Sequence, residues 1–131
     1  MNFADIKTIA VVGLSDDPSK ASNHVASYLQ NCGYRVIPIN PGYDYLLGEK
    51  AYPNLASVPS DINIDVVDIF RRPDAVKPIV EQAVDRGGVK VIWMQEGVVN
   101  EEASDLACKA GLECVMNKCM LKEHIRTRFG D

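Results

Sequence analysis

The sequence predicts an α/β protein with a Rossmann-like, three-layer fold, in which a five-stranded parallel sheet carries helices on both faces. Short β-branched apolar runs alternate with longer segments of helical spacing along the 131 residues. The runs are apolar throughout rather than at every second residue, which indicates strands buried on both faces. Right-handed crossovers between such strands favour the strand order 3-2-1-4-5, counted along the chain.

The amino-terminal part predicts a strand, a helix and a second strand. The strands span residues 7–12 and 34–39, and the helix between them spans residues 22–31. Ser22 is a suitable N-cap for this helix, and Gly33 is a suitable residue to end it.

The middle of the chain predicts a long irregular segment, a strand and a helix. Residues 40–59 are irregular, because turn residues and prolines recur there. Residues 65–70 form the third strand. A helix then begins at Pro73, a position where proline is tolerated, and it ends at the Gly87-Gly88 pair.

The carboxyl-terminal part continues the alternation. Strands are expected at residues 89–94 and 112–116, with a helix at 101–110 between them and a terminal helix at 118–129. We find no repeat, low-complexity tract or linker, so residues 1–131 are expected to form a single domain.

Composition restricts the classes of function. The net charge of -4 argues against broad binding to nucleic acid, which favours a basic face. The chain shows no charged-then-apolar leader and no apolar run near the roughly 20 residues of a membrane helix, so a cytoplasmic location without membrane attachment is expected. Four cysteines without C-x-x-C spacing are expected to be reduced thiols, and no metal site is predicted.

The binding site is expected at the carboxyl ends of the strands, where such sheets bind ligands at the reversal of strand order. The first helix points its amino end at the same crevice, which favours an anion. The residues at these ends are Gly13-Leu14-Ser15, Asn40-Pro41-Gly42, Arg71-Arg72-Pro73, Gln95-Glu96-Gly97 and Asn117-Lys118-Cys119.

Two common nucleotide-binding motifs are absent. A dinucleotide site needs G-x-G-x-x-G and an acidic residue at the end of the second strand, whereas this chain has G-L-S-D-D-P and Asn40. A G-x-x-x-x-G-K-[ST] loop does not occur either. Arg71 and Arg72, directly before a helix, are suited to phosphate through paired, charge-assisted hydrogen bonds, although two solvated loop arginines would look the same in the sequence.

Four segments in order, VVGLSDDPSKAS, GYRVIPINPG, DVVDIFRRPD and VIWMQEGV, resemble the small single-domain CoA-binding protein family over nearly the whole chain. That family is similar to the CoA-binding domain of succinyl-CoA synthetase α subunits, in which a strand-end glycine loop and a T-E-G loop contact CoA. Residues 95–97 match the second loop, with glutamine in place of threonine.

The resemblance implies coenzyme A, or an acyl-CoA, as the ligand. By position, the glycine loop and the start of the first helix would hold the pyrophosphate, and the end of the second strand would line the crevice beside it. The end of the third strand would cover the adenine and meet phosphate charge, while the Q-E-G loop would flank the pantetheine. The residues implied are Gly13, Ser15, Lys20, Ser22, Asn40, Pro41, Phe70, Arg71, Arg72, Pro73, Gln95, Glu96 and Gly97.

No catalytic set is evident. Related ligases need a phosphorylatable histidine on a further domain, and His24 and His124 sit elsewhere. Cys119 follows the fifth strand near a helix start, where a thiolate would be stabilised, so we consider it a redox thiol that could form a mixed disulfide with CoA; a packed, unreactive thiol is the alternative.

Three functions therefore remain. The favoured one is a non-catalytic CoA-binding carrier, sensor or regulator. The others are a component of a multi-chain acyl-CoA ligase or transferase, and an NAD(P)-linked redox sensor. A homodimer or another protein partner is compatible with each of them.

Overall fold

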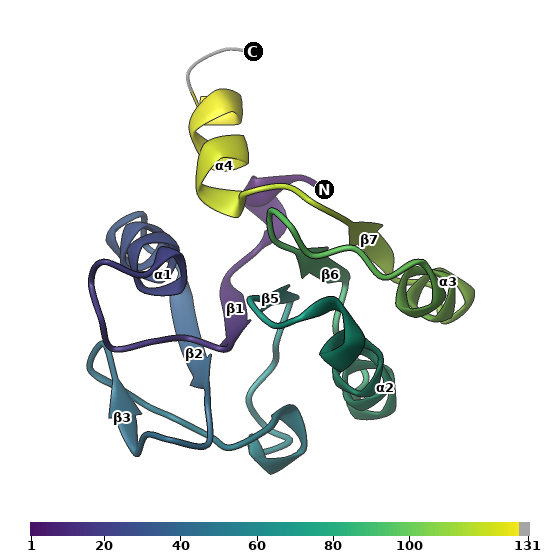
Figure 1. Cartoon of the computed structure of the whole chain (residues 1–131), viewed down its shortest axis with the longest axis horizontal. Helices are drawn as coiled ribbons and strands as arrows, with labels where there is room; N and C mark the ends of the chain where they lie inside the picture. Colours follow the sequence, from purple (N-terminus) through teal and green to yellow (C-terminus); the bar gives the residue numbers. More distant parts are fainter. Residues whose placement is uncertain (129–131) are drawn as a thin grey trace.

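A computed structural model describes residues 1–128, and a five-stranded parallel sheet lies at its centre (Figure 1). This confirms the predicted α/β fold class. The strands are β1 (Thr8–Val12), β2 (Arg35–Ile39), β5 (Val66–Ile69), β6 (Val91–Met94) and β7 (Glu113–Val115). The long helices are α1 (Ala21–Asn31), α2 (Val76–Arg86), α3 (Glu101–Lys109) and α4 (Met120–Arg128).

The helices cover the sheet from both sides (Figure 1). Alternate residues of β1 enter different apolar clusters: Ile9 and Val11 pack with α1 and α4, whereas Ala10 and Val12 pack with α2 and α3. The continuous apolar character of the strand therefore reflects burial on both of its faces, as the sequence pattern indicates.

The strand order is β2-β1-β5-β6-β7, which differs from the predicted neighbours. The third long strand, β5, pairs with β1, with Val67 opposite Ala10, and does not lie outside β2 as the order 3-2-1-4-5 requires. The reason is the connection between β2 and β5, which has no long helix. It forms a small hairpin, β3 (Tyr45–Leu46) with β4 (Glu49–Lys50), and then the short helix η2 (Leu55–Ser57).

The connection begins on the face of α1, where Leu46 of the hairpin is buried, and then passes to the opposite face, where Leu55 packs in the cluster that contains α2 and α3. The chain thus moves from β1 to β2 on one face and returns past β1 on the other. Strand order consequently reverses between β1 and β5, and their carboxyl ends mark the point where a ligand site is expected.

Arg86, in the last turn of α2, holds this connection in place. Its guanidinium donates hydrogen bonds to the carbonyl groups of Val58, Pro59 and Ile62 at 2.6 to 2.8 Å, with a longer bond to Leu55. A single charged side chain therefore satisfies carbonyl groups in the second half of the crossover segment, from Leu55 to Ile62.

Helix ends agree with the sequence in part. Gly33 ends α1 with a positive φ of 98°, and Tyr34 N–H donates to the Leu29 carbonyl, as in a Schellman motif. The N-cap of α1 is Lys20 rather than Ser22, which lies within the first turn. Pro73 opens the short helix η3 (Pro73–Ala75), and α2 follows it directly.

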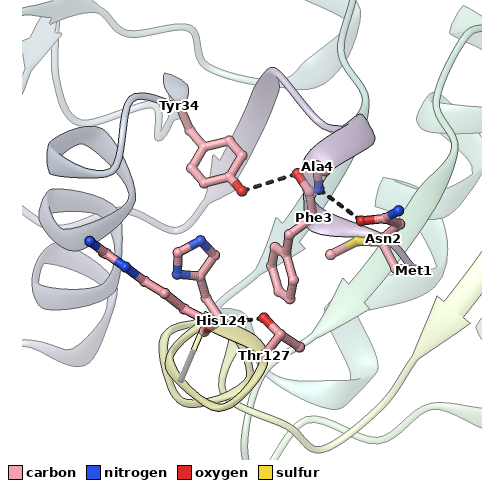
Figure 2. A pocket seen from close by; sticks show the side chains of 8 residues that line it. Met1, Asn2, Phe3, Ala4, Tyr34, His124 and Thr127 are labelled. Atoms are coloured by element: carbon pink, nitrogen blue, oxygen red, sulfur yellow. Dashed lines mark hydrogen bonds between the residues drawn. The ribbon is translucent and has the colours of Figure 1, made fainter. Parts of the chain in front are cut away.

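The two ends of the described chain meet beside α1 (Figure 1). Phe3, in the short helix η1 (Phe3–Asp5), and Tyr34 both direct their rings toward His124 of α4, and the three line one shallow cavity (Figure 2). The expected terminal helix 118–129 begins at Met120, and Phe129 lies outside the described residues. Within residues 1–128, no helix has the length and apolarity needed to cross a bilayer.

Candidate functional site

A cavity of about 300 Å³ opens where strand order reverses. It lies at the carboxyl ends of β1, β2 and β5, and it also receives Pro53 from the crossover segment. Of the residues predicted for the site, the structure brings together five here. The lining consists of Val12, Gly13, Ile39, Asn40, Pro41, Pro53, Phe70 and Arg71.

Gly13 allows the ends of β1 and β5 to approach each other. Its φ is 87°, and a Cβ at this position would lie 2.3 Å from the Phe70 carbonyl oxygen and 3.1 Å from Cδ of Arg71. Gly13 N–H donates to the Ile39 carbonyl at 2.9 Å, so this amide is already used. The glycine therefore contributes space to the crevice rather than a free hydrogen-bond donor.

The two arginines after β5 diverge. Arg71 lines the cavity, and its guanidinium makes no hydrogen bond or ion pair with any residue of 1–128. Arg72 instead pairs with Asp74 at 3.3 Å, is 78% exposed and does not line the cavity. One free positive charge thus stands at the mouth of the crevice, and an anion is the group it can bind through paired hydrogen bonds.

Asn40 joins the end of β2 to the glycine loop. Its Nδ2 donates to the Leu14 carbonyl at 2.9 Å, and its Oδ1 accepts from Gly42 N–H at 3.0 Å. Each end of the amide makes one hydrogen bond, and these two bonds fix Asn40 as part of the wall of the cavity.

The remainder of the glycine loop folds back on α1. Ser15 N–H donates to Ser22 Oγ at 3.0 Å, and the Ser15 carbonyl accepts from Asn23 Nδ2 at 2.9 Å. Ser15, Lys20 and Ser22 do not line the cavity. In this conformation their contribution is to fix the loop and the start of α1.

The two acidic residues of the loop are engaged away from the cavity. Asp16 Oδ1 accepts from the Tyr43 hydroxyl at 3.0 Å. Asp17 Oδ1 accepts from the Ser19 N–H and hydroxyl, and these hydrogen bonds lower the pKa of Asp17. Both side chains are exposed and neither lines the cavity, so they do not oppose an anion inside it.

The 95–97 loop is fastened to the first turn of α4 and to the segment before it. Gln95 is buried, and its Oε1 accepts from Met120 N–H at 3.1 Å. Glu96 pairs with Lys122 at 3.1 Å, and Gly97 N–H donates to Asn117 Oδ1 at 2.7 Å. The predicted Q-E-G residues are thus not in the cavity of Gly13 and Arg71, and Pro73 is not there either.

A second cavity of about 260 Å³ adjoins the first, and the two share Val12, Ile39, Pro53 and Arg71. Its other walls are largely apolar and come from Asn54, Leu55, Ala75, Pro78, Ile79 and Gln82. Sequence reasoning missed these residues, because it treated residues 40–59 as an irregular connection and looked for the site only at the ends of the strands, whereas four of the six belong to η3 and α2. The Tyr52-Pro53 pair marks the place where that segment returns to β2, through a bridge between Ile39 and Tyr52.

Asp68 is a buried acid that sequence reasoning also missed. It lies in the central strand β5, fully buried, and neither carboxylate oxygen has a hydrogen-bond partner among the described residues. Burial raises the pKa of Asp68 well above its usual range, because the apolar surroundings disfavour the ionised carboxylate. The sequence did contain a signal for this buried acid, because Asp68 stands within the apolar run DVVDIF.

Cys119 lies directly before α4 and is half-buried against the cluster that contains α1. Its carbonyl accepts from Glu123 N–H at 3.0 Å, so it occupies the N-cap position of the helix. Within residues 1–128, no group of three or more histidine, cysteine, aspartate or glutamate side chains could hold a metal ion.

Comparison with known proteins gives one family. Residues 7–125 match the model of a CoA binding domain. An uncharacterized Bacillus subtilis protein, YneT, is 38% identical over 93% of this chain and 88% of its own length. A solved structure of a hypothetical protein from Pyrococcus horikoshii is 44% identical, with a TM-score of 0.89 over 94% of this chain and 84% of its own.

Larger enzymes contain a related unit. An ADP-forming acetate–CoA ligase of Archaeoglobus fulgidus is 25% identical over 87% of this chain, which spans 18% of the ligase. The structure of an acetyl-coenzyme A synthetase from Candidatus Korarchaeum cryptofilum, in complex with phosphate and ADP, is 32% identical, with a TM-score of 0.70 over 82% of this chain and 25% of the synthetase.

Proposed function

The chain belongs to the family of CoA binding domains, and from that premise we propose that residues 1–131 form one domain that binds coenzyme A or an acyl-CoA as a carrier, sensor or regulator. The observation that carries the proposal is the pairing of Gly13 with Arg71: a crevice kept open by a missing side chain, with an unpaired guanidinium at its mouth. A phosphate-bearing ligand fits both features.

Each part of the ligand has a candidate place. Arg71 would meet phosphate charge, beside the wall formed by Asn40 and Pro41. Phe70 would cover the adenine, and the adjoining apolar cavity offers space for the base. Ser15, Lys20 and Ser22 at the start of α1 would assist the pyrophosphate, and the pantetheine would run along Gln95, Glu96 and Gly97.

The neighbouring arginines provide a matched test. We would titrate the reduced protein calorimetrically with CoA, acetyl-CoA and NAD⁺, and repeat the titrations with Arg71→Ala and Arg72→Ala. Loss of a charge-assisted phosphate contact costs about 1.5–3 kcal/mol, or roughly 10- to 150-fold in affinity, and we expect this for Arg71→Ala. Arg72→Ala, which removes an exposed ion pair, should bind almost as the wild type does. Absence of CoA binding would reject the proposal.

A component of a multi-chain acyl-CoA ligase or transferase is the second candidate. The observation in its favour is that curated relatives named as ADP-forming CoA ligases are several times longer than this chain. This function predicts that an ADP-forming acyl-CoA ligase activity copurifies with the tagged chain. Arg71→Ala should abolish that activity. An NAD(P)-linked sensor predicts instead that NAD⁺ competes with CoA, which Asn40 disfavours because a dinucleotide site has an acidic residue at the end of the second strand.

Cys119 is proposed as a redox thiol beside the same edge of the sheet. Its thiolate would attack the disulfide of oxidised CoA, form a protein–CoA disulfide and release one CoA thiol, so that no further oxidant is needed. Mass spectrometry after incubation with CoA disulfide should show one CoA adduct that Cys119→Ser abolishes. Cys108→Ser, at an exposed cysteine of α3, should retain it. An undiminished adduct in Cys119→Ser would remove Cys119 from the proposal.

A further inference from the structure

The apolar cavity that adjoins the crevice is lined by two elements that are distant in the sequence. Helix α2 and the crossover segment with η2 lie side by side and supply most of its walls (Figure 1). The apolar carbon comes from Ala75, Pro78 and Ile79 on the first side and from Pro53 and Leu55 on the second. An apolar group of a ligand can therefore enter between them.

Two carboxamide side chains interrupt this apolar lining, Gln82 of α2 and Asn54 directly before η2. Gln82 Oε1 accepts from Leu55 N–H at 3.1 Å. Asn54 Oδ1 accepts from the N–H and the hydroxyl of Ser57, both at 2.9 Å. Because a backbone N–H can only donate, the oxygen of each amide must be the atom that faces it, and this fixes the orientation of both amides.

The nitrogen atom of each carboxamide is left over. Neither Nε2 of Gln82 nor Nδ2 of Asn54 has a hydrogen-bond partner within residues 1–128. The Arg71 guanidinium, at the junction with the crevice, has none there either. Every side-chain group of this lining that makes no hydrogen bond is therefore a donor.

Two parts of an acyl-CoA are apolar enough for such a cavity, the acyl chain and the adenine. An acyl chain offers no acceptor atom, so it would cover the two amide nitrogens without replacing their hydrogen bonds to water, which costs free energy. The adenine base has apolar faces, and its ring nitrogens accept hydrogen bonds at the edge. The phosphates attached to its ribose suit the Arg71 guanidinium. The set of donors thus favours the base.

We propose that Gln82 and Asn54 select the base and that the cavity excludes the acyl chain. This inference rests on the proposed function and narrows its ligand: the protein recognises the nucleotide end of CoA, which free CoA and every acyl-CoA share. The 95–97 loop, along which the pantetheine would run, lines neither cavity. The acyl group then stays outside both cavities, and CoA thioesters of different acyl length bind alike.

A series of thioesters tests the choice between base and acyl chain without any change to the protein. We would titrate it calorimetrically with CoA, acetyl-CoA, butyryl-CoA and hexanoyl-CoA, and with adenosine 3′,5′-bisphosphate, which is the nucleotide end of CoA alone. We expect the bisphosphate to compete with CoA, and the thioesters to bind within about twofold of one another. An acyl chain inside the cavity would instead raise the affinity about fourfold for each added CH₂ group, and that increase would overturn the proposal.

Two conservative variants test the two residues. Gln82→Glu and Asn54→Asp each keep the oxygen that accepts from the backbone N–H, and each replaces the free NH₂ group by a second oxygen. Loss of one hydrogen bond should weaken the binding of CoA and of the bisphosphate by the same factor, roughly 3- to 10-fold. Ser60→Asp is the control for the added charge, because Ser60 is exposed on the crossover and does not line this cavity.

Urea unfolding should give both variants nearly the stability of the wild type, because the backbone N–H groups keep their acceptors. Losses of affinity no greater than in Ser60→Asp would overturn the role of Gln82 and Asn54. Absence of binding by CoA and by the bisphosphate alike would reject the proposed function itself. Tight binding of CoA that the bisphosphate does not displace would leave the proposed function standing and remove this inference alone.

Discussion

The carbonyl oxygen of Phe70 lies 2.3 Å from the position that a Cβ on Gly13 would occupy. This contact joins the carboxyl ends of β1 and β5, the two strands between which strand order reverses. The crevice at this point therefore depends on one residue without a side chain. Gly13 also has a φ of 87°, a conformation that residues with a side chain rarely adopt.

Gly13→Ala should destabilise the protein and distort the crevice. The positive φ costs about 1 kcal/mol, and displacement of the Phe70 carbonyl adds about 1–3 kcal/mol. Gly48→Ala is the matched control, because Gly48 has a φ of 77° and open space around its Cβ position. Denaturant unfolding of both variants separates the two costs. Equal losses of stability would show that the contact with Phe70 relaxes freely.

Asp68→Asn should stabilise the protein at neutral pH. The folded-state pKa of Asp68 lies above the unfolded value, so the native state binds more protons between the two pKa values and stability falls as pH rises through that window. The amide of the variant has the same shape but cannot ionise, so the stability of the variant does not fall as pH rises through that window. We expect a gain of about 1–3 kcal/mol at pH 7 that shrinks toward pH 4.

Urea unfolding of wild type and Asp68→Asn at several pH values measures this difference. Asp65→Asn is the control for removal of a buried acid, because Asp65 accepts hydrogen bonds from Lys7 and Thr8 N–H and its replacement should destabilise the protein. A constant difference between Asp68→Asn and wild type from pH 4 to pH 8 would mean that Asp68 does not titrate abnormally.

Much of this architecture follows from local sequence features, and the exceptions have a physical reason. Apolar runs identified the five long strands, and Gly33 identified the end of α1, because burial and a positive φ leave signatures in neighbouring residues. The position of β5 beside β1 left no such signature. It depends on which face the crossover takes, and Leu55 and Arg86, far apart in the sequence, determine that face.

The candidate site divides in the same way. Gly13, Asn40 and Arg71 reach one cavity because each follows a strand directly, and strand ends are visible in the sequence. Arg72 differs from Arg71 because its side chain turns to Asp74 at the start of η3. The sequence of two consecutive arginines does not show which of the two side chains faces the cavity. Pro53 entered the cavity through tertiary folding of the crossover.

Arg86→Ala should release the crossover and, with it, one wall of both cavities. The substitution leaves the carbonyl groups of Val58 and Ile62 without the guanidinium donor, and each partly buried orphan costs about 1–3 kcal/mol where water cannot replace it, whereas the Pro59 carbonyl keeps a hydrogen bond from Ile62 N–H. Arg86→Lys should recover part of the loss, since an ammonium group can reach fewer carbonyl groups than a guanidinium.

Amide hydrogen exchange of the crossover measures this release. We expect faster exchange at Val58 and Tyr52, whose N–H groups donate to Leu55 and Pro38, while exchange in β6 stays slow. Addition of free guanidinium at low concentration should restore part of the protection in Arg86→Ala. Unchanged exchange in the crossover would show that packing of Leu55 alone holds the segment.

Asn40→Asp should weaken ligand binding without creating a dinucleotide site. The carboxylate still accepts from Gly42 N–H, but it cannot donate to the Leu14 carbonyl, so two oxygens face each other where the wild type has a hydrogen bond at 2.9 Å. The new negative charge also stands at the wall that Arg71 shares.

We expect roughly tenfold weaker CoA binding in Asn40→Asp, because a hydrogen bond is lost and repulsion is added. Calorimetry at low and high salt measures this change. Added salt should recover the electrostatic part, because screening acts on the repulsion and leaves the lost hydrogen bond unchanged. Pro41→Ala, which changes the same wall without charge, is the control; a gain of NAD⁺ affinity in Asn40→Asp would instead show that the end of β2 alone selects the nucleotide.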